Sequence, residues 1–282
     1  MSRVETNESA DYVSTTINYS LPNPMGTPLY AIQPYPNSAS FRTNYIVDSR
    51  KIFVHNLRGR EHAFSLDQNG FQFLVHHTNE TFVDTESIRK NYFPEVQELL
   101  MKETGAHRAL IVGHTMRHGR DRDLSTTTST SDVIIRPPAH CVHADRTPQA
   151  VAVEVVEHLG PEGENLLRGR VRFIVVWRPI GQVYSEPLAV ADSQSSSMTD
   201  LLPVRLKTSS NSTEALLARF NEKHKWYYLK NQMPHEVILI KGFDNYAEDS
   251  ARMCLHSAFQ DPGSEPDAPR RSSIEVKAIV FG

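Results

Sequence analysis

VRFIVVWR, residues 171–178, begins a series of short β-branched and apolar segments that fills the second half of this chain. Segments of this composition, separated by turn residues, are typical of β-strands. The series continues with PLAVAD (187–192), WYYLK (226–230), HEVILIKGF (235–243), ARMCLHSAF (251–259) and SIEVKAIVF (273–281). Many short strands of this kind predict a barrel or a double-sheet jelly roll.

The first half of the chain adds further strands and the first of the helices. Strand character appears in residues 44–57, 71–77 and 109–115. Residues 86–104 predict a helix, because Tyr92, Val96, Leu99 and Leu100 recur near the helical period, with Gly105 as a C-cap and Pro94 as a point of division.

Three more helices are predicted later in the chain. Thr147 can N-cap a helix that runs from Pro148 to about His158, with proline at its first position. Shorter helices are expected over residues 161–168 and 214–222. The polar segment 121–132 predicts a loop that could act as a mobile lid, and the Ser-rich segment 193–213 is expected to contain another loop.

The predicted fold class is α+β and mainly β: a double-stranded β-helix (jelly roll, cupin-like) core with helices packed outside. We expect this core over about residues 108–282, within a single domain of residues 41–282. Residues 1–40 are polar and Pro-rich, which predicts an irregular N-terminal arm. The arm could cover the active site or exchange with a partner subunit in a homodimer.

Composition narrows the class of protein and its partners. The chain has 282 residues, a net charge of −3 and no block of like charges, so nucleic acid is not an expected partner. Residues 1–16 lack the apolar core of a signal peptide, and no apolar run reaches the roughly 18–20 residues that span a bilayer. Only Cys141 and Cys254 are present, which excludes a disulfide scaffold. We therefore expect a cytoplasmic protein that acts on a free small molecule.

Two histidines and one aspartate form the candidate metal site. His143 and Asp145 are two residues apart, so on an extended segment both side chains point to one face. His256 lies in a late strand, which a jelly roll brings opposite the earlier ones. Two imidazoles and one carboxylate form the facial triad that binds non-haem Fe(II) and leaves coordination positions open for a cosubstrate and O2. His140 also precedes Asp145, but no shared strand face links the two.

A basic residue near the C-terminus completes the candidate site. Arg271 and Ser273 alternate on one face of the last predicted strand, and Glu275 and Lys277 continue that face. A planar guanidinium with a nearby hydroxyl suits the clamping of a carboxylate, here that of 2-oxoglutarate. Arg270 is a direct rival to Arg271, but a shift of one residue reverses the face, so only one can point inward.

At these residues the chain resembles the hydroxylase/desaturase oxygenases of the AsaB and CmcJ type, which include gibberellin-desaturase-like proteins. The resemblance runs from about Tyr45 to the C-terminus, and these segments carry it: FSLDQNGFQFL, NYFPEVQELL, HADRTP, LLRGRVRFIVVWRP, KWYYLKNQMPHEVILIKGFDN, CLHSAFQDP and RRSSIEVKAIVF. It implies a double-stranded β-helix that uses Fe(II), 2-oxoglutarate and O2. Carried over by residue, His143, Asp145 and His256 would bind iron and Arg271 the far carboxylate of 2-oxoglutarate, while Arg178 could orient substrate or cosubstrate.

These observations lead to one principal hypothesis for function and two alternatives. An Fe(II)/2-oxoglutarate-dependent oxygenase would hydroxylate, desaturate or cyclise a small molecule of secondary metabolism through a ferryl intermediate, releasing succinate and CO2. A cupin-type metal dioxygenase or isomerase would work without 2-oxoglutarate, and the Arg271–Ser273 pair argues against it. A non-catalytic jelly roll that binds a small molecule would not need intact metal ligands.

Overall fold

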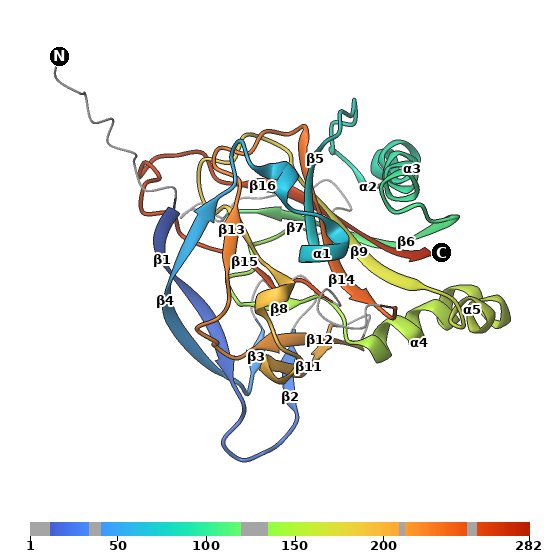
Figure 1. Cartoon of the computed structure of the whole chain (residues 1–282), viewed down its shortest axis with the longest axis horizontal. Coiled ribbons are helices and arrows are strands. Elements are labelled where there is room, and N and C mark those ends of the chain that lie inside the picture. The colour runs from blue at the N-terminus through green and yellow to red at the C-terminus, as the bar shows by residue number, and fades with distance from the viewer. Residues whose placement is uncertain (1–11, 34–40, 120–134, 209–211, 247–252) are drawn as a thin grey trace.

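The computed structural model describes residues 12–33, 41–119, 135–208, 212–246 and 253–282. Two β-sheets form the body of the molecule, and the helices lie at its periphery (Figure 1). The larger sheet contains, in spatial order, β1 (Tyr12–Leu21), β4 (Ile46–Asn56), β13 (Trp226–Tyr228), β10 (Leu188–Ala191), β15 (His256–Ala258), β8 (His143–Ala144), β12 (Ser212–Ala218), β11 (Leu201–Lys207), β2 (Leu29–Ile32) and β3 (Arg42–Thr43). The smaller sheet contains β5 (Phe71–Val75), β14 (Glu236–Asp244), β9 (Val171–Pro179), β16 (Ser272–Phe281), β6 (Arg108–His118) and β7 (Ile135–Arg136).

The sheets pack against each other through the alternation of side chains along their strands. Odd-numbered residues of β9, such as Phe173, Val175 and Trp177, join Leu188 and Val190 of β10 in one buried cluster between the sheets. Even-numbered residues of β9 and of β16 point the other way, into a second cluster formed with α3. Because strand side chains alternate with a period of two, each face of the smaller sheet has its own core.

The helices are short, and most follow the predicted positions. They are α1 (Leu66–Asn69), α2 (Thr85–Ser87), the π-helical segment η2 (Ile88–Tyr92), α3 (Phe93–Thr104), α4 (Pro148–Leu159) and α5 (Pro161–Leu166). Single 3-10 turns occur at η1 (Glu61–Ala63), η3 (Ser193–Ser195) and η4 (Met198–Asp200). The predicted N-cap of α4 is confirmed, since the Thr147 side chain accepts a hydrogen bond from the Ala150 amide. Gly105 ends α3 in the left-handed conformation, as expected of a C-cap.

The expectation of an irregular arm over residues 1–40 is wrong for its described part. Residues 12–21 form β1, which pairs with β4 over its whole length, and Asn18 bridges to Cys141 so that the larger sheet curls back on itself. Residues 29–32 form β2, which pairs in parallel with β11. Buried Thr15 and Ile17 alternate with exposed Ser14 and Thr16, and this is the strand signal that the polar composition concealed.

Residues 214–222 were expected to form a helix and do not. Residues 212–218 form β12 instead, in a hairpin with β11, which occupies part of the expected loop 193–213. EALLARF has good helix formers, but pairing on both edges of β12 with β11 and β8 outweighs this local propensity. The predicted loop 121–132 lies outside the described residues. Among the described helices, none is long and apolar enough to cross a membrane.

Candidate metal centre

Neighbouring strands of the larger sheet bring the two candidate histidine ligands together. His143 of β8 is the direct cross-strand partner of His256 of β15, and their ring centroids lie 4.3 Å apart. Asp145 follows β8 immediately and remains buried at 7% exposure. One ligand atom from each of the three residues lies within 4.8 Å of the others. The arrangement predicted from spacing is therefore present, with three different donor groups converging on one point.

Backbone carbonyls fix the orientation of both imidazole rings. His143 Nδ1 lies 2.8 Å from the Cys141 carbonyl oxygen, and His256 Nδ1 lies 3.3 Å from the Cys254 carbonyl oxygen. Donation from each Nδ1–H sets the tautomer in which Nε2 carries the free lone pair. Each cysteine thus contributes its backbone, two residues before the histidine that it orients. The paired geometry suits two neutral imidazoles that bind one metal ion through Nε2.

The third candidate ligand, Asp145, is held as a carboxylate by Lys277 and by its polar contact with His256. Its Oδ2 lies 3.4 Å from His256 Nε2, and its Oδ1 lies 3.2 Å from Lys277 Nζ of β16. Burial alone would raise the pKa of Asp145, but Lys277 and then His256 outweigh it and hold the pKa well below the usual range. Oδ1 is therefore engaged by the lysine, while Oδ2 faces the imidazoles.

The predicted clamp arginine lies inside the protein and its rival lies outside. Arg271 is 2% exposed, whereas Arg270 is exposed. Arg271 donates through Nη1 to the Glu186 carbonyl oxygen at 2.6 Å, and its guanidinium lies 5.5 Å from the centre of the Trp177 ring. Burial lowers the pKa of Arg271 to about 10, and nearby Arg117 adds to the effect. The group remains charged at neutral pH in a setting that favours an incoming anion.

Polar atoms with unmet hydrogen-bonding capacity surround this guanidinium. Among the described residues, Arg271 Nε, Ser273 Oγ and Trp177 Nε1 are buried without a hydrogen-bond partner. Buried polar groups are normally satisfied, so three unpartnered atoms in one region indicate a binding site for a polar ligand. All three can donate to oxygen, which is the chemistry required to bind a carboxylate. These residues fit 2-oxoglutarate, as the histidines and Asp145 fit Fe(II).

The last strand carries the clamp and the metal-site lysine on a single face. Arg271 precedes β16, and Ser273, Glu275 and Lys277 follow at every second position on the side that faces the larger sheet. Arg117 of β6 forms a two-pronged ion pair with Glu275, with Nη2 at 3.1 Å from Oε2. Burial raises the pKa of Glu275, but Arg117 and Lys277 outweigh it and the net shift is downward. Glu275 and Lys277 on this face therefore each have a partner of opposite charge, Arg117 and Asp145.

The structure does not bring Arg178 to the site. Arg178 is the cross-strand partner of Ile274, whose side chain faces α3 rather than the metal centre. Its guanidinium donates to Tyr92 Oη at 2.8 Å and to the Pro234 carbonyl oxygen at 2.7 Å. The expectation that Arg178 orients substrate or cosubstrate is therefore wrong, because a shift of one residue along a strand reverses the face.

His140, the rival to His143 as a metal ligand, contacts Glu186 instead, with His140 Nε2 2.8 Å from Glu186 Oε1.

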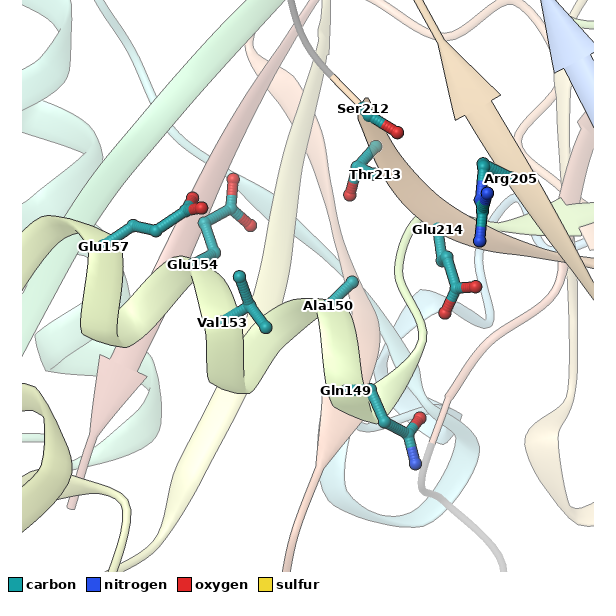
Figure 2. A pocket seen from close by; sticks show the side chains of 9 residues that line it. All are labelled: Gln149, Ala150, Val153, Glu154, Glu157, Arg205, Ser212, Thr213 and Glu214. Carbon is teal, nitrogen blue, oxygen red and sulfur yellow. The ribbon is translucent and has the colours of Figure 1, made fainter.

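A cavity of about 260 Å³ opens beside His143. Its wall is mostly apolar and includes Phe41, Tyr45, Leu206 and Leu217. A second cavity, of about 310 Å³, lies between α4 and the β11–β12 hairpin and is lined by Glu154, Glu157 and Glu214 among others (Figure 2). None of the candidate metal ligands lines this second cavity. Of these two cavities, the first is lined by a candidate metal ligand, His143.

Several residues of the site had no predicted role. Lys277 was placed on the correct face, but its contact with Asp145 depends on how the two sheets pack. Glu186 has a φ of +49°, uncommon for a residue with a side chain, and this conformation presents its carbonyl to Arg271. Arg117 and Trp177 come from strands that looked like ordinary core strands. For Trp177, the one available signal was that it alternates with Phe173 and Val175 and so shares their inward-facing side of the strand.

Comparison with known proteins agrees with this geometry. A family model described as "Oxidoreductase/YMDC permease-like domain" matches residues 17–281. The chain is 30% identical to the hydroxylase/desaturase efuI of Hormonema carpetanum, over 83% of this chain and 84% of that protein. It is 32% identical to the Fe(II)/2-oxoglutarate-dependent dioxygenase nvfI of Aspergillus novofumigatus, over 90% of each. The solved structure of the iron and alpha-ketoglutarate-dependent endoperoxidase NvfI superposes with a TM-score of 0.82 at 28% identity, covering 96% of this chain and 98% of that one. This chain therefore belongs to the hydroxylase/desaturase family of Fe(II)/2-oxoglutarate-dependent oxygenases.

Proposed function

We propose that this protein is a small-molecule oxygenase of secondary-metabolite biosynthesis in which His143, Asp145 and His256 hold Fe(II). The convergence of the two imidazoles and one carboxylate within 4.8 Å is the observation that carries the proposal. Three protein ligands leave positions open, which suits a cosubstrate and O2. The two facing sheets are interpreted as those of a double-stranded β-helix, with the metal site between them.

In this proposal Arg271 and Ser273 hold the far carboxylate of 2-oxoglutarate. The guanidinium is already oriented by the Glu186 carbonyl, so one nitrogen is fixed and Nε remains available. The Ser273 hydroxyl and the Trp177 N–H supply further donors from the same face. Pre-set donors reduce the entropy lost on binding and fix the distance between the cosubstrate and the metal.

The bound iron and cosubstrate would supply the oxidising chemistry, with succinate and CO2 released, while the chain supplies geometry and exclusion of water. His143 and His256 present Nε2 because their Nδ1 atoms are engaged by carbonyls. Lys277 holds Asp145 Oδ1, so that Oδ2 faces the metal position. The apolar cavity beside His143 would receive the substrate and place one of its carbon atoms near the metal.

The relatives indicate a range of products rather than one. Their names include hydroxylase/desaturase and endoperoxidase, and we propose hydroxylation, desaturation or ring formation as the outcomes open to this chain. Which of them occurs depends on where the substrate radical lies relative to the metal, a property of the substrate in its cavity.

Formation of succinate from 2-oxoglutarate tests the proposal. Wild-type protein supplied with Fe(II), ascorbate, O2 and 2-oxoglutarate should form succinate slowly without substrate, and His143→Ala should form none above the protein-free background. His62→Ala is the matched control, because His62 is exposed and distant in sequence from the ligands, and it should behave as wild type. Folded, iron-loaded wild type that forms no succinate would contradict the proposal.

A further inference from the structure

Two arginines lie side by side at the cavity that reaches His143. Arg117 of β6 and Arg136 of β7 are direct partners in the parallel pairing of these strands. Both line the cavity together with His143. Like charges directly opposite each other on neighbouring strands destabilise a sheet unless something compensates them.

Only one of the two arginines has a carboxylate partner among the described residues. Glu275 pairs with Arg117 through two nitrogens, and Arg117 Nη1 also donates to the Pro137 carbonyl oxygen at 2.9 Å. Arg136 lies over the Phe41 ring, 6.0 Å from its centre, and no ion pair joins it to a carboxylate in the described part of the chain. Burial, and then repulsion from Arg117, lowers the pKa of Arg136. Its charge is thus under-compensated at the cavity wall.

The remainder of the cavity wall offers little else to a polar ligand. Apolar side chains from the β11–β12 hairpin, among them Val204, Leu206 and Leu217, line the cavity together with Phe41 and Tyr45. The Phe41 ring lies against the Arg136 guanidinium. Arg271 does not line this cavity, so the cosubstrate clamp is separate from Arg136. The cavity therefore has one arginine without a carboxylate partner among the described residues, an apolar body and a candidate metal ligand.

We propose that this cavity takes an apolar small molecule that carries a carboxylate, with the carboxylate paired to Arg136 and the hydrocarbon body directed toward His143. The inference rests on the proposed function and adds the chemical class of the substrate. A single guanidinium matches one carboxylate through two parallel N–H···O bonds, which fixes orientation as well as affinity. That pairing would offset the repulsion from Arg117 and determine which carbon atom faces the metal position.

A shape-matched pair of probes tests this inference. Calorimetry under anaerobic conditions, with Fe(II) and 2-oxoglutarate saturating so that the Arg271 site is filled, would compare 1-adamantanecarboxylate with 1-adamantanecarboxamide. We expect wild type to bind the carboxylate roughly tenfold more tightly or better, because charge-assisted hydrogen bonds exceed neutral ones by about that factor. Arg136→Gln should abolish the difference between the probes, and Arg136→Lys should retain part of it.

Arg205→Gln is the matched control for charge and size. Arg205 lies on β11 between Val204 and Leu206, so it points to the opposite face and lines the second cavity (Figure 2). This variant should keep the full preference for the carboxylate. The comparison of the two probes in wild type needs no variant, so it stands even if Arg136→Gln fails to fold.

Three outcomes would overturn the inference. These are equal binding of the two probes by wild type, an unchanged preference in folded Arg136→Gln, and displacement of 2-oxoglutarate by the carboxylate probe, which would place that probe at Arg271. Failure of the proposed function is seen separately, as the absence of a visible charge-transfer band from Fe(II) and 2-oxoglutarate in wild type before any probe is added.

Discussion

Lys277 Nζ lies 3.2 Å from Asp145 Oδ1 and joins the two sheets at the candidate metal centre. Asp145 follows β8 in the larger sheet, and Lys277 lies in β16 of the smaller one. Both side chains are largely buried, at 8% and 16% exposure. The contact compensates the charge of the buried aspartate and engages one of its two oxygens. The other oxygen, Oδ2, faces His256.

Lys277→Met should destabilise the metal-free protein and increase its stabilisation by metal. Removing one partner of a buried ion pair leaves the other uncompensated, at a cost of about 3–5 kcal/mol. A divalent ion bound by Asp145 would then supply the missing charge, so Zn(II) or Mn(II) should raise the melting temperature more in the variant than in wild type. Lys207→Met, on an exposed residue, is the control. Metal-free Lys277→Met as stable as wild type would disprove the role of the contact.

Arg271→Gln should weaken 2-oxoglutarate binding, whereas Arg270→Gln should not. Loss of charge-assisted hydrogen bonds worth about 1.5–3 kcal/mol corresponds to a rise of roughly 10- to 100-fold in the dissociation constant. The two residues are adjacent and chemically identical, but one is buried and the other exposed. Anaerobic titration of the Fe(II)-loaded proteins with 2-oxoglutarate would measure both. Equal effects of the two substitutions would refute the assignment of the clamp.

Asp244→Asn should destabilise the fold in a pH-dependent manner. The Asp244 carboxylate is fully buried, with Oδ2 2.7 Å from Arg170 Nη2 and 3.1 Å from Lys241 Nζ. Burial alone would raise its pKa, but Arg170 and Lys241 outweigh burial and lower it. A folded-state pKa below the unfolded one means that the stabilisation is present above the unfolded value, about 3.9, and is lost as the pH falls through the folded value.

Urea unfolding of wild type and Asp244→Asn at several pH values would measure this dependence. The difference in unfolding free energy should be about 3–5 kcal/mol at pH 7 and should shrink below about pH 3.9. Asp67→Asn is the control, since Asp67 contacts the same two cations but is 65% exposed, so its loss should cost about 1 kcal/mol or less. A gap that is the same at pH 3 and pH 7 would show that the charge of Asp244 is irrelevant.

Features that depend on a few neighbouring residues, such as helix caps and the shared face of alternate residues in a strand, could be predicted from the sequence. The spacing of His143 and Asp145 and the alternation of Arg271 with Ser273 correctly placed each pair on a shared face. The Thr147 cap and the Gly105 C-cap were confirmed, because capping depends on a few neighbouring residues. Segment 171–178 was correctly predicted as a strand because it is rich in apolar and β-branched residues.

Long-range pairing accounts for what could not be predicted. Residues 214–222 have helical propensity, and only their pairing with β8 and β11 makes part of them a strand. Arg178 is a residue type suited to binding a carboxylate, but its position along β9 points its side chain toward α3. Likewise, the contact of Lys277 with Asp145 and the unusual backbone of Glu186 arise from the packing of segments far apart in the chain.

The most direct test of the account is anaerobic addition of Fe(II) and 2-oxoglutarate to the purified protein, followed by visible spectroscopy. Wild type should show the weak metal-to-ligand charge-transfer band of bound Fe(II) and 2-oxoglutarate, and His256→Ala, checked for folding by circular dichroism, should lack it. A well-folded, iron-loaded wild type without the band, or a His256→Ala variant that keeps it at full intensity, would contradict the assignment of this site.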